Sequence, residues 1–588
     1  MSDQPSPHKK NPAPVWIILV IPAVIAVFAL FLKQAVGPYW LSLNNDPSYI
    51  YLMNALYLVG GISPIFIQHP GITLQLLMAG LIKMLNFSAA TPVILDRAFT
   101  DPEYFLNATY FVLLAVYLIS LIAVGYYALK KTRSSLAALL IQSSAFLFLT
   151  MPAYDGYEYV LTIITNINAE TLLISITNLY VIGLLKLYFD ETKQAAVRSA
   201  VLLGLACALG VMTKLAFLPM LLLALFLLPG ARPRMVFVLT FFILVFLLSL
   251  PIAARYGEIY KWIQGLIVYD GVHGSGKANF INPGRYVFAL GVLIKSNWVI
   301  FAVYFLSFLA AFYYYSADRK PQKASAQSRK NILFWLAMSG VALLQFAMVA
   351  KQPATRYLVP AAGMMGLVLY FVYQFLQNKG YRLKEGVAVF FLLFMIVNGA
   401  YAYQYQKKMS TINQEIYNFS QKVFNKYKDC VICPYYRSSS PLFALEFGDD
   451  CSGFKGYAKL LKEKYPTAHF YHFWGKYFHD FTSDTANLKQ MLADSPCVLL
   501  YGQPYQEFPN KFLKLEEIES SPNESVYKIL ATTAEEAVTA YLVSKRAAAR
   551  QHYKDAYIFA LKAQSLGFPN IDEYILQLKT LLQQNQVR

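Results

Sequence analysis

Long apolar runs alternate with short polar segments over roughly the first 400 residues of the chain. The first run, Val15 to Leu32, contains no charged residue, and comparable runs lie at 105–129, 135–152, 169–185, 235–254, 296–316, 332–350, 357–377 and 386–403. Each is about long enough to cross some 30 Å of hydrocarbon as an α-helix. The pattern therefore predicts a polytopic membrane protein.

The stretch 199–229 is apolar except for Lys214, so it is compatible with one long helix or two short ones. A single crossing would move the basic cluster 319–330 to the outer side, whereas two crossings keep every basic loop on one side. We therefore predict two helices with Lys214 at their outer turn, for a total of about eleven spans. Lys9 and Lys10 precede the first run, whose length and lack of a small-residue cleavage site favour an uncleaved signal anchor.

Basic residues are concentrated in every second loop. They are Lys130, Lys131 and Arg133, then Lys193 and Arg198, Arg232 and Arg234, the cluster 319–330, and finally Lys379, Arg382 and Lys384. Loops rich in Lys and Arg stay in the cytoplasm, so these loops and the N-terminal residues 1–13 are assigned there. Segments 37–104, 152–168, 256–295, 351–356 and everything beyond Tyr403 are then expected on the outer side.

Composition agrees with a membrane solvent. Of the 588 residues, 57% are hydrophobic and 14% are charged, which one water-soluble core of this size could hardly accommodate. The net charge of +18 comes from basic residues that lie mainly between apolar runs, so it reports orientation and not a nucleic-acid partner. The 44 Tyr and 42 Phe suit interfacial belts and a lipid or sugar substrate, although lipid-facing bulk accounts for the larger share.

The chain becomes polar beyond Tyr403. Residues 497–501 and 526–530 have the pattern of strands, and 411–426 and 455–464 that of helices. The expected architecture is an α-helical transmembrane domain over 14–403 and a soluble α/β domain over 404–532. A helical hairpin over 533–588, similar to one tetratricopeptide-like unit, completes it.

Four of the five cysteines, Cys430, Cys433, Cys451 and Cys497, lie in this C-terminal part. On an oxidising side of the membrane, structural disulfides are the favoured use, and three pairings remain open. A redox or zinc site is less favoured, because Cys451 and Cys497 do not form a second close pair.

The first outer loop contains Asp46, which is followed by Pro47. An Asp with Pro at the next position is typical of a helix N-cap, and capping is compatible with catalysis. The apolar stretches of this loop are too short to cross and are expected to lie along the membrane interface. Asp46 is therefore expected at the outer membrane surface.

Three further charged residues are expected at the same membrane face. Glu170 opens the fourth span, Lys214 lies at the outer turn of the helix pair, and Arg356 with Tyr357 begins the tenth span. An acid at this depth is costly unless it faces a watery cavity or a partner. These residues and Asp46 are candidates for one shared site.

The order of these motifs resembles the GT-C superfamily of membrane glycosyltransferases, which includes the protein O-mannosyltransferases and the lipid A aminoarabinose transferases. The resemblance covers roughly residues 14–403. It is carried by Asp46 three residues before Tyr49, by His69-Pro70, by the Asn-x-acid start of the fourth span at Glu170, by the Gly-rich segment Gly204 to Lys214, and by Arg356-Tyr-Leu-x-Pro360. Many relatives have two adjacent acids where this chain has Asn45-Asp46, and several have Pro-Pro where it has Pro70-Gly71. The use of a divalent metal is therefore left open.

The resemblance implies transfer of a sugar from a polyprenyl-phosphate donor to a lipid, glycan or protein acceptor. Asp46 is then the base that takes the proton of the acceptor hydroxyl. Arg356 is the first candidate for binding the phosphate, followed by Lys214, Arg97 and Lys351, and the alternative for each is interfacial snorkelling. Glu170 would orient sugar hydroxyls or pair with a base. His69 is as well suited to a structural hydrogen bond, and Tyr49 and Tyr357 complete the expected substrate-binding set.

The third outer loop contains a sequence similar to a P-loop, Gly271 to Lys277, but Ala278 lacks the hydroxyl that would bind Mg²⁺. A nucleotide site on the outer side is not expected. A Gly-rich lid is the better interpretation, with Asp270, His273 and Lys277 in reach of substrate.

Two other classes of function share these features. A transporter or flippase of lipid-linked precursors would have the same spans and intramembrane charges, but no internal repeat is evident. A non-catalytic scaffold for envelope assembly would leave Asp46 as a cap only. The expected location is a bacterial inner membrane with the C-terminal domain in the periplasm, and an ER lumen is the alternative.

Overall fold

The computed structural model describes residues 14–587 except for 43–44, 68–70, 153–161, 272–273, 275–276, 318–325, 382–383, 436–438, 453–455, 475–476, 482–487, 496, 503–512, 533, 550–551 and 569–570. The chain divides into two compact units. The first comprises residues 1–36 and 54–407, and the second comprises 37–53 and 408–588. The segment 37–53, which belongs to the predicted first outer loop, thus groups with the C-terminal part of the chain, and no sequence pattern indicated this.

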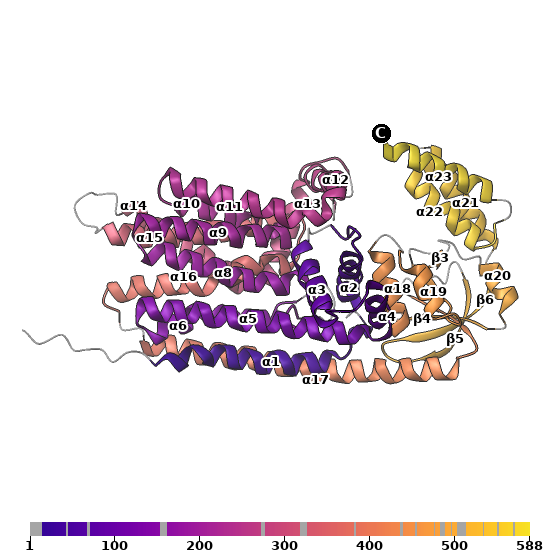
Figure 1. Cartoon of the computed structure of the whole chain (residues 1–588), viewed down its shortest axis with the longest axis horizontal. Helices are drawn as coiled ribbons and strands as arrows, with labels where there is room; N and C mark the ends of the chain where they lie inside the picture. The colour runs from indigo at the N-terminus through magenta and orange to yellow at the C-terminus, as the bar shows by residue number, and fades with distance from the viewer. Residues whose placement is uncertain are drawn as a thin grey trace, which may run out of the picture. The chain divides into compact units, whose positions relative to one another are not determined.

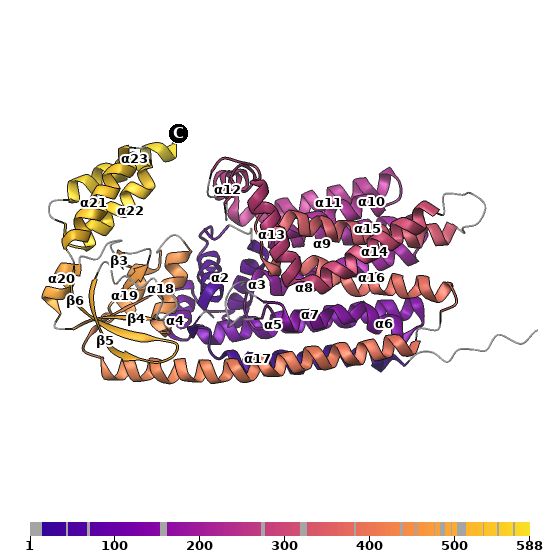
Figure 2. The same ribbon diagram turned by 180° about the vertical axis from the view of Figure 1, so that it is seen from behind.

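The first unit is helical, and its long helices lie side by side in both views (Figures 1 and 2). Its elements are η1 (Val15–Leu19), α1 (Val20–Val36), α3 (Ile72–Leu85), α4 (Thr91–Thr100), α5 (Pro102–Thr132), α6 (Ser135–Gln142), η3 (Ser143–Phe146), α7 (Leu147–Thr150), α8 (Ala169–Phe189), α9 (Lys193–Thr213), η4 (Leu215–Phe217), α10 (Leu218–Leu227), α11 (Ala231–Ser249), η5 (Leu250–Arg255), α12 (Tyr256–Val268), α13 (Pro283–Ser296), α14 (Trp298–Ala317), α15 (Ala326–Val349), η7 (Thr355–Leu358) and α16 (Val359–Asn378). Helices α2 (Asn45–Val59) and α17 (Lys384–Lys426) cross the division between the units.

Among the described residues, eight helices are long and apolar enough to cross a membrane. They are 15–36, 102–132, 169–189, 193–213, 231–268, 298–316, 328–349 and 355–378. The chain is therefore a polytopic membrane protein, as predicted. The expected count of about eleven also included three stretches that are not among these eight. They are 135–152, which the structure divides into α6, η3 and α7, the second half of 199–229, which contains the short helix α10, and 386–403, which is the beginning of the 43-residue helix α17.

The break predicted near Lys214 is present. Helix α9 ends at Thr213, Lys214 has extended backbone angles (φ −161°, ψ 133°), and η4 and the short helix α10 follow. Gly210 makes room for this break, because an added Cβ would come within 2.4 Å of the Phe217 ring. Gly204 of the same helix lies against α11, where a Cβ would come within 2.9 Å of the carbonyl oxygen of Phe237. The glycines of this helix therefore allow close packing.

The second unit contains a four-stranded sheet in the order β1-β4-β6-β5, with β1 (Val431–Pro434) parallel to β4 (Val498–Gly502) and the other pairs antiparallel. Strand β6 (Ser525–Thr532) lies between β4 and the edge strand β5 (Leu513–Ser520), and β2 (Tyr471–Trp474) pairs with β3 (Tyr477–Asp480) separately. The helices are α18 (Pro441–Cys451), α19 (Ala458–Lys464), α20 (Leu488–Asp494), α21 (Ala534–Ala549), α22 (Tyr553–Ser565) and α23 (Asp572–Val587). The α/β character and both predicted strands are present, but the tail has three helices instead of a two-helix hairpin.

Side chains of β4 alternate between the two faces of this sheet. Val498 and Leu500 pack with residues of the tail helices, including Ala540 and Ala556. Leu499 and Tyr501 pack with a second cluster that includes Val423 at the end of α17. The sheet is thus covered by α17 on one face and by the tail helices on the other.

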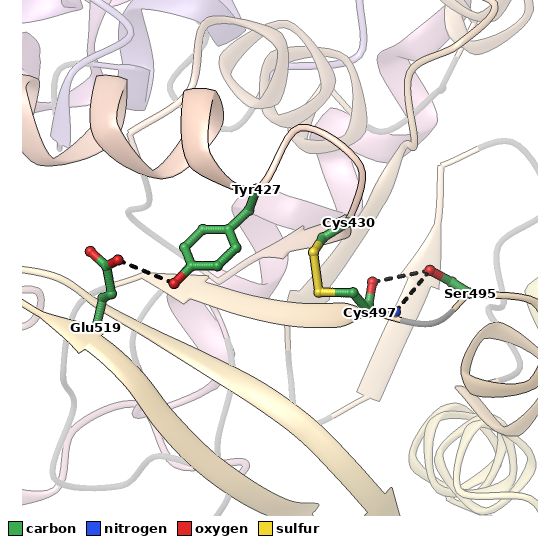
Figure 3. The surroundings of a disulfide bond; sticks show 5 residues. All are labelled: Tyr427, Cys430, Ser495, Cys497 and Glu519. Atoms are coloured by element: carbon green, nitrogen blue, oxygen red, sulfur yellow. Dashed lines mark hydrogen bonds between the residues drawn. A yellow bond between two sulfur atoms is a disulfide. The ribbon is translucent and has the colours of Figure 1, made fainter.

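One disulfide joins Cys430 and Cys497, the residues that precede β1 and β4 (Figure 3). It links the two strands at the point where their parallel pairing begins. Cys433 and Cys451 are free thiols. The prediction of a structural disulfide is confirmed for this one pair, and the structure selects the partner that the sequence left open.

Candidate active site

The fold brings Glu170, Lys214 and Arg356 together from three helix ends. Glu170 is in the first turn of α8, which Asn168 caps by accepting a hydrogen bond from the Thr171 N–H at 2.9 Å. Lys214 occupies the break after α9, and Arg356 lies in η7, one turn before α16. Because each residue sits where a regular helix is interrupted, its side chain can reach across to the neighbouring helices.

The carboxylate of Glu170 is the centre of this group. Lys214 Nζ donates to Glu170 Oε1, and Arg356 Nε lies 3.4 Å from the same oxygen. Glu170 and Lys214 are 3% and 5% exposed. One buried carboxylate therefore holds two cations, and the group has a net positive charge. Such an arrangement favours the binding of an anion.

Tyr357 is the fourth member of the group. Its ring lies 4.5 Å from Lys214 Nζ and 5.4 Å from Arg356 Cζ, both distances measured to the ring centroid. Its carbonyl oxygen accepts a hydrogen bond of 2.7 Å from Gln345 Nε2, and the same amide nitrogen donates to the carbonyl oxygen of Ala216 at 3.1 Å. The ring and backbone of Tyr357 thus tie the start of α16 to the break after α9.

A cavity of about 320 Å³ opens beside this group. Three cationic side chains line it, namely Arg285, Lys351 and Arg356, together with the acid Asp270. Burial lowers the pKa of Lys351, and Asp270 opposes that effect. Lys351 Nζ donates to the carbonyl oxygen of Ile267 at 2.7 Å and lies 4.7 Å from the Phe280 ring centroid. The cavity therefore has the cations that a phosphate requires.

Arg285 was not identified from the sequence. It lies in the first turn of α13, and the side chain of the capping residue Asn282 accepts a hydrogen bond from its N–H at 3.2 Å. The capping pattern Asn-Pro-Gly-Arg could have predicted the helix start, but nothing in the sequence indicated that this residue lines the same cavity as Arg356.

A second cavity of about 290 Å³ adjoins the first and shares Lys351, Gln352 and Tyr357 with it. Apart from Lys214 and the shared residues, its walls are apolar: they are formed by Leu215, Ala216, Leu218, Trp262, Ile263, Leu266, Ile267, Met348 and Val349. A space with three cations among its lining residues thus adjoins an apolar one. This is the form expected of a site for an amphiphile with an anionic head.

The third outer loop contributes Asp270 to the first cavity. Tyr269 and Ala278 form an isolated bridge, and the Lys277 N–H donates to Asp270 Oδ1 at 3.1 Å. Gly274 has φ +76°, and a Cβ there would come within 2.9 Å of the Gly265 backbone in α12. The loop therefore folds back on α12. His273 lies outside the described residues, and the lid remains a prediction.

Asp46 and Tyr49 belong to the second unit, whereas Glu170, Lys214 and Arg356 belong to the first. Asp46 has extended backbone angles (φ −97°, ψ 120°) immediately before the regular turns of α2, as an N-cap residue does. Tyr49 is fully buried. The meeting of Asp46 with the Glu170 group remains a prediction from the sequence.

Two other sequence candidates have different positions. Arg97 is in α4, where its Nη1 donates to Asn86 Oδ1 at 2.8 Å, and it is not among the residues that line either cavity. His69 lies outside the described residues. In the part of the chain that the structure describes, no group of three or more His, Cys, Asp or Glu side chains is arranged to hold a metal ion.

No family model and no curated protein matches the sequence. The fold is similar to the crystal structure of ArnT from Cupriavidus metallidurans bound to undecaprenyl phosphate, with 12% sequence identity and a TM-score of 0.42. The match covers 88% of this chain and 98% of that one.

Proposed function

We propose that this protein is an integral membrane glycosyltransferase that moves a sugar from a polyprenyl-phosphate donor to an acceptor on the extracytoplasmic side. The main support is the pair of adjoining cavities that share Lys351 and Tyr357. The first has three cations among its lining residues, and the second has apolar walls apart from Lys214 and the shared residues. A polyprenyl phosphate has the same two parts, an anionic head and a hydrocarbon chain. The donor class is also the one that the sequence resemblance implies.

The cationic cavity would hold the phosphate. Arg356, Arg285 and Lys351 approach it from η7, from α13 and from the turn after α15. Charge-assisted hydrogen bonds to phosphate are about twice as strong as neutral ones. The isoprenoid portion nearest the head would then pack against Trp262, Leu266 and Met348 in the second cavity.

Glu170 would orient the cations without cancelling their charge. Its single carboxylate contacts both Lys214 and Arg356, so one positive charge remains when all three are ionised. The cations are then fixed before the substrate arrives and need little rearrangement as negative charge develops on the leaving phosphate. This arrangement accelerates departure of the lipid phosphate.

The reaction forms a bond between the acceptor oxygen and the anomeric carbon, and it breaks the bond between that carbon and the phosphate oxygen. The proton of the acceptor hydroxyl passes to a carboxylate, because a neutral alcohol is a poor nucleophile. The sequence resemblance assigns this role to Asp46. The electron pair of the broken bond stays with the lipid phosphate, which the cations of the first cavity bind.

The proposed location is a bacterial inner membrane, with the second unit in the periplasm. The acceptor would be a lipid, a glycan or a protein that reaches the outer face of the membrane. Neither a nucleotide nor a nucleic acid is required by this reaction.

The test is covalent transfer from labelled polyprenyl-phosphate sugars in proteoliposomes that contain the full chain. Arg356→Ala should reduce transfer at least roughly 100-fold, as expected for loss of a group that binds developing charge. Lys261→Ala is the matched control, because Lys261 is exposed on α12 and lines neither cavity, so its activity should equal that of the wild type. Movement of labelled donor lipid between leaflets without any covalent transfer would favour the flippase alternative and refute the proposal.

A further inference from the structure

The segment that carries Asp46 is attached to the C-terminal domain on both sides of this residue. Before Asp46, the Ser42 N–H donates to Ser439 Oγ at 3.1 Å, although the two residues are 397 positions apart in the chain. In the same region, the Trp40 ring lies 5.6 Å from that of Tyr417. All of these residues belong to the second unit.

After Asp46, the backbone of Tyr49 lies directly against helix α18. A Cβ added to Gly448 would come within 2.7 Å of the Tyr49 carbonyl oxygen and within 2.9 Å of its carbonyl carbon. Only glycine allows this approach without displacement of one backbone. The pKa of the Cys451 thiol, at the end of α18, is raised by burial and by the carboxylates of Asp450 and Asp46, so Asp46 itself lies near this helix end.

Ser439 is held in turn by the core of the domain. Its hydroxyl donates to Glu524 Oε1 at 2.9 Å, and its carbonyl oxygen accepts a hydrogen bond of 2.6 Å from Ser420 Oγ in α17. The second carboxyl oxygen of Glu524 accepts from Tyr501, whose side chain belongs to the sheet. A continuous series of hydrogen bonds thus connects the sheet, through Glu524 and Ser439, to Ser42.

We propose that the C-terminal domain positions Asp46 for catalysis, with Ser439 and Gly448 as the two positioning residues. This inference rests on the proposed function, in which Asp46 is the base. A base must be placed to within about 0.5 Å of its productive geometry, and a loop reaches that precision only when a rigid scaffold holds it. Ser42 and Tyr49 stand four residues before and three residues after Asp46, so contacts at these two points restrict the segment between them. The domain then contributes to catalysis by holding the segment that carries the base.

The experiment compares the full-length variants Ser439→Ala and Gly448→Ala with the wild type in lipid nanodiscs. Hydrogen exchange of peptides that cover residues 37–53 measures the attachment, and kcat and KM for the donor measure its consequence. Gly80→Ala is the control, since Gly80 is an exposed helical glycine with nothing within 4 Å of an added Cβ.

We expect faster exchange over residues 37–53 in both variants, a kcat lowered roughly tenfold or more, and a donor KM within about twofold of the wild type. A KM that rises while kcat is maintained would overturn the inference, because the donor cavities lie elsewhere in the chain. Faster exchange with unchanged kcat would overturn it as well. If Gly448→Ala does not fold, the test rests on Ser439→Ala alone, since this substitution removes a hydroxyl group and adds no atoms.

Failure of the proposed function would look different. A wild-type protein that transfers no sugar from any polyprenyl-phosphate donor would refute the glycosyltransferase proposal and, with it, the assignment of Asp46 as a base. The exchange measurement would still show whether Ser439 and Gly448 hold the segment. Unchanged exchange in both variants would refute the attachment itself, whatever the activity of the wild type.

Discussion

Lys214 and Glu170 form a buried ion pair between the break after α9 and the first turn of α8, 44 residues apart in the chain. Arg356 adds a second cation to the same carboxylate oxygen at 3.4 Å. Because a charge in the membrane interior is costly without a partner, these three residues depend on one another. The structure therefore links the stability of the helix bundle to the charges that the proposed reaction uses.

Replacing Glu170 should destabilise the protein strongly. In Glu170→Gln, Lys214 and Arg356 lose the charge that compensates both of them, and breaking a buried pair in this way costs about 3–5 kcal/mol. We expect a clearly lower midpoint of thermal unfolding in detergent and loss of donor binding. In the double variant Glu170→Gln with Lys214→Met, part of the stability should return, because the buried ammonium group that has lost the Glu170 carboxylate is removed as well.

The control for this prediction is Glu191→Gln, which removes the partner of Lys330 in an exposed ion pair. Exposed pairs contribute about 0–1 kcal/mol, so the midpoint should hardly change. Equal destabilisation by Glu170→Gln and Glu191→Gln would contradict the importance of the buried pair.

Arg285 should contribute to donor affinity, although no motif indicated it. Arg285→Ala removes one of three cations that line the first cavity, and a hydrogen bond to a charged group is worth about 1.5–3 kcal/mol. We expect the Kd for a polyprenyl phosphate to rise roughly 10- to 100-fold. The measurement is direct binding of the unlinked lipid phosphate, which is independent of turnover.

Lys295→Ala is the matched control, because Lys295 is an exposed cation on the same helix, α13, and does not line the cavity. A comparable loss of affinity in both variants would indicate a general effect of positive charge at the membrane surface instead of a phosphate site.

The grouping of Glu170, Lys214 and Arg356 could be predicted from the sequence, because membrane topology limits which helix ends can meet. Alternating basic loops orient the spans, and orientation places Glu170, Lys214 and Arg356 at one membrane face. The same reasoning missed Arg285, which lines the same cavity as Arg356 because of the way α13 packs. It also treated 135–152 as one regular span, whereas the structure ends α6 at Gln142, whose buried amide nitrogen donates to the carbonyl oxygens of Ile18 and Leu121.

The attachment of segment 37–53 could not be predicted for a related reason. The contact between Ser42 and Ser439 joins residues 397 positions apart, and neither serine differs in pattern from other serines of the chain. Contacts of this kind depend on tertiary packing, which hydrophobic periodicity does not encode. The role of Gly448 could not be predicted either, since the reason for a glycine within a helix is evident only when the residue packed against it is known.

Reduction of the disulfide should destabilise the C-terminal domain. Cys430 and Cys497 close a loop with a sequence separation of 67, for which the chain-entropy relation gives about 4 kcal/mol. We expect the variant Cys430→Ser with Cys497→Ser to unfold at a lower temperature than the oxidised wild type and at nearly the same temperature as the reduced wild type. Cys451→Ser, which changes a free thiol, serves as the control and should leave the effect of reductant intact.

Glu524 should make the stability of the second unit depend on pH. Its carboxyl group is buried, and burial raises its pKa to about 8, although Tyr501 and Ser439 oppose this by hydrogen bonding. Below pH 4.5, the ordinary pKa of this carboxyl group in the unfolded chain, Glu524 is protonated in both the folded and the unfolded forms and has no effect on how stability changes with pH. Between pH 4.5 and 8 the unfolded chain loses this proton while the folded domain retains it, so the free energy of unfolding decreases as pH rises.

Glu524→Gln tests this dependence, because glutamine stays neutral over the whole range. The midpoint of thermal unfolding of the wild type should decrease from pH 5 to pH 8, and this decrease should be smaller in the variant. Each pKa unit of the shift corresponds to about 1.4 kcal/mol, so the contribution is on the order of 4 kcal/mol at pH 8. Glu415→Gln is the control, since Glu415 is an exposed acid on α17 that accepts a hydrogen bond from Asn523. An identical pH profile for the wild type and Glu524→Gln would show that the buried carboxyl group is already ionised in the folded domain.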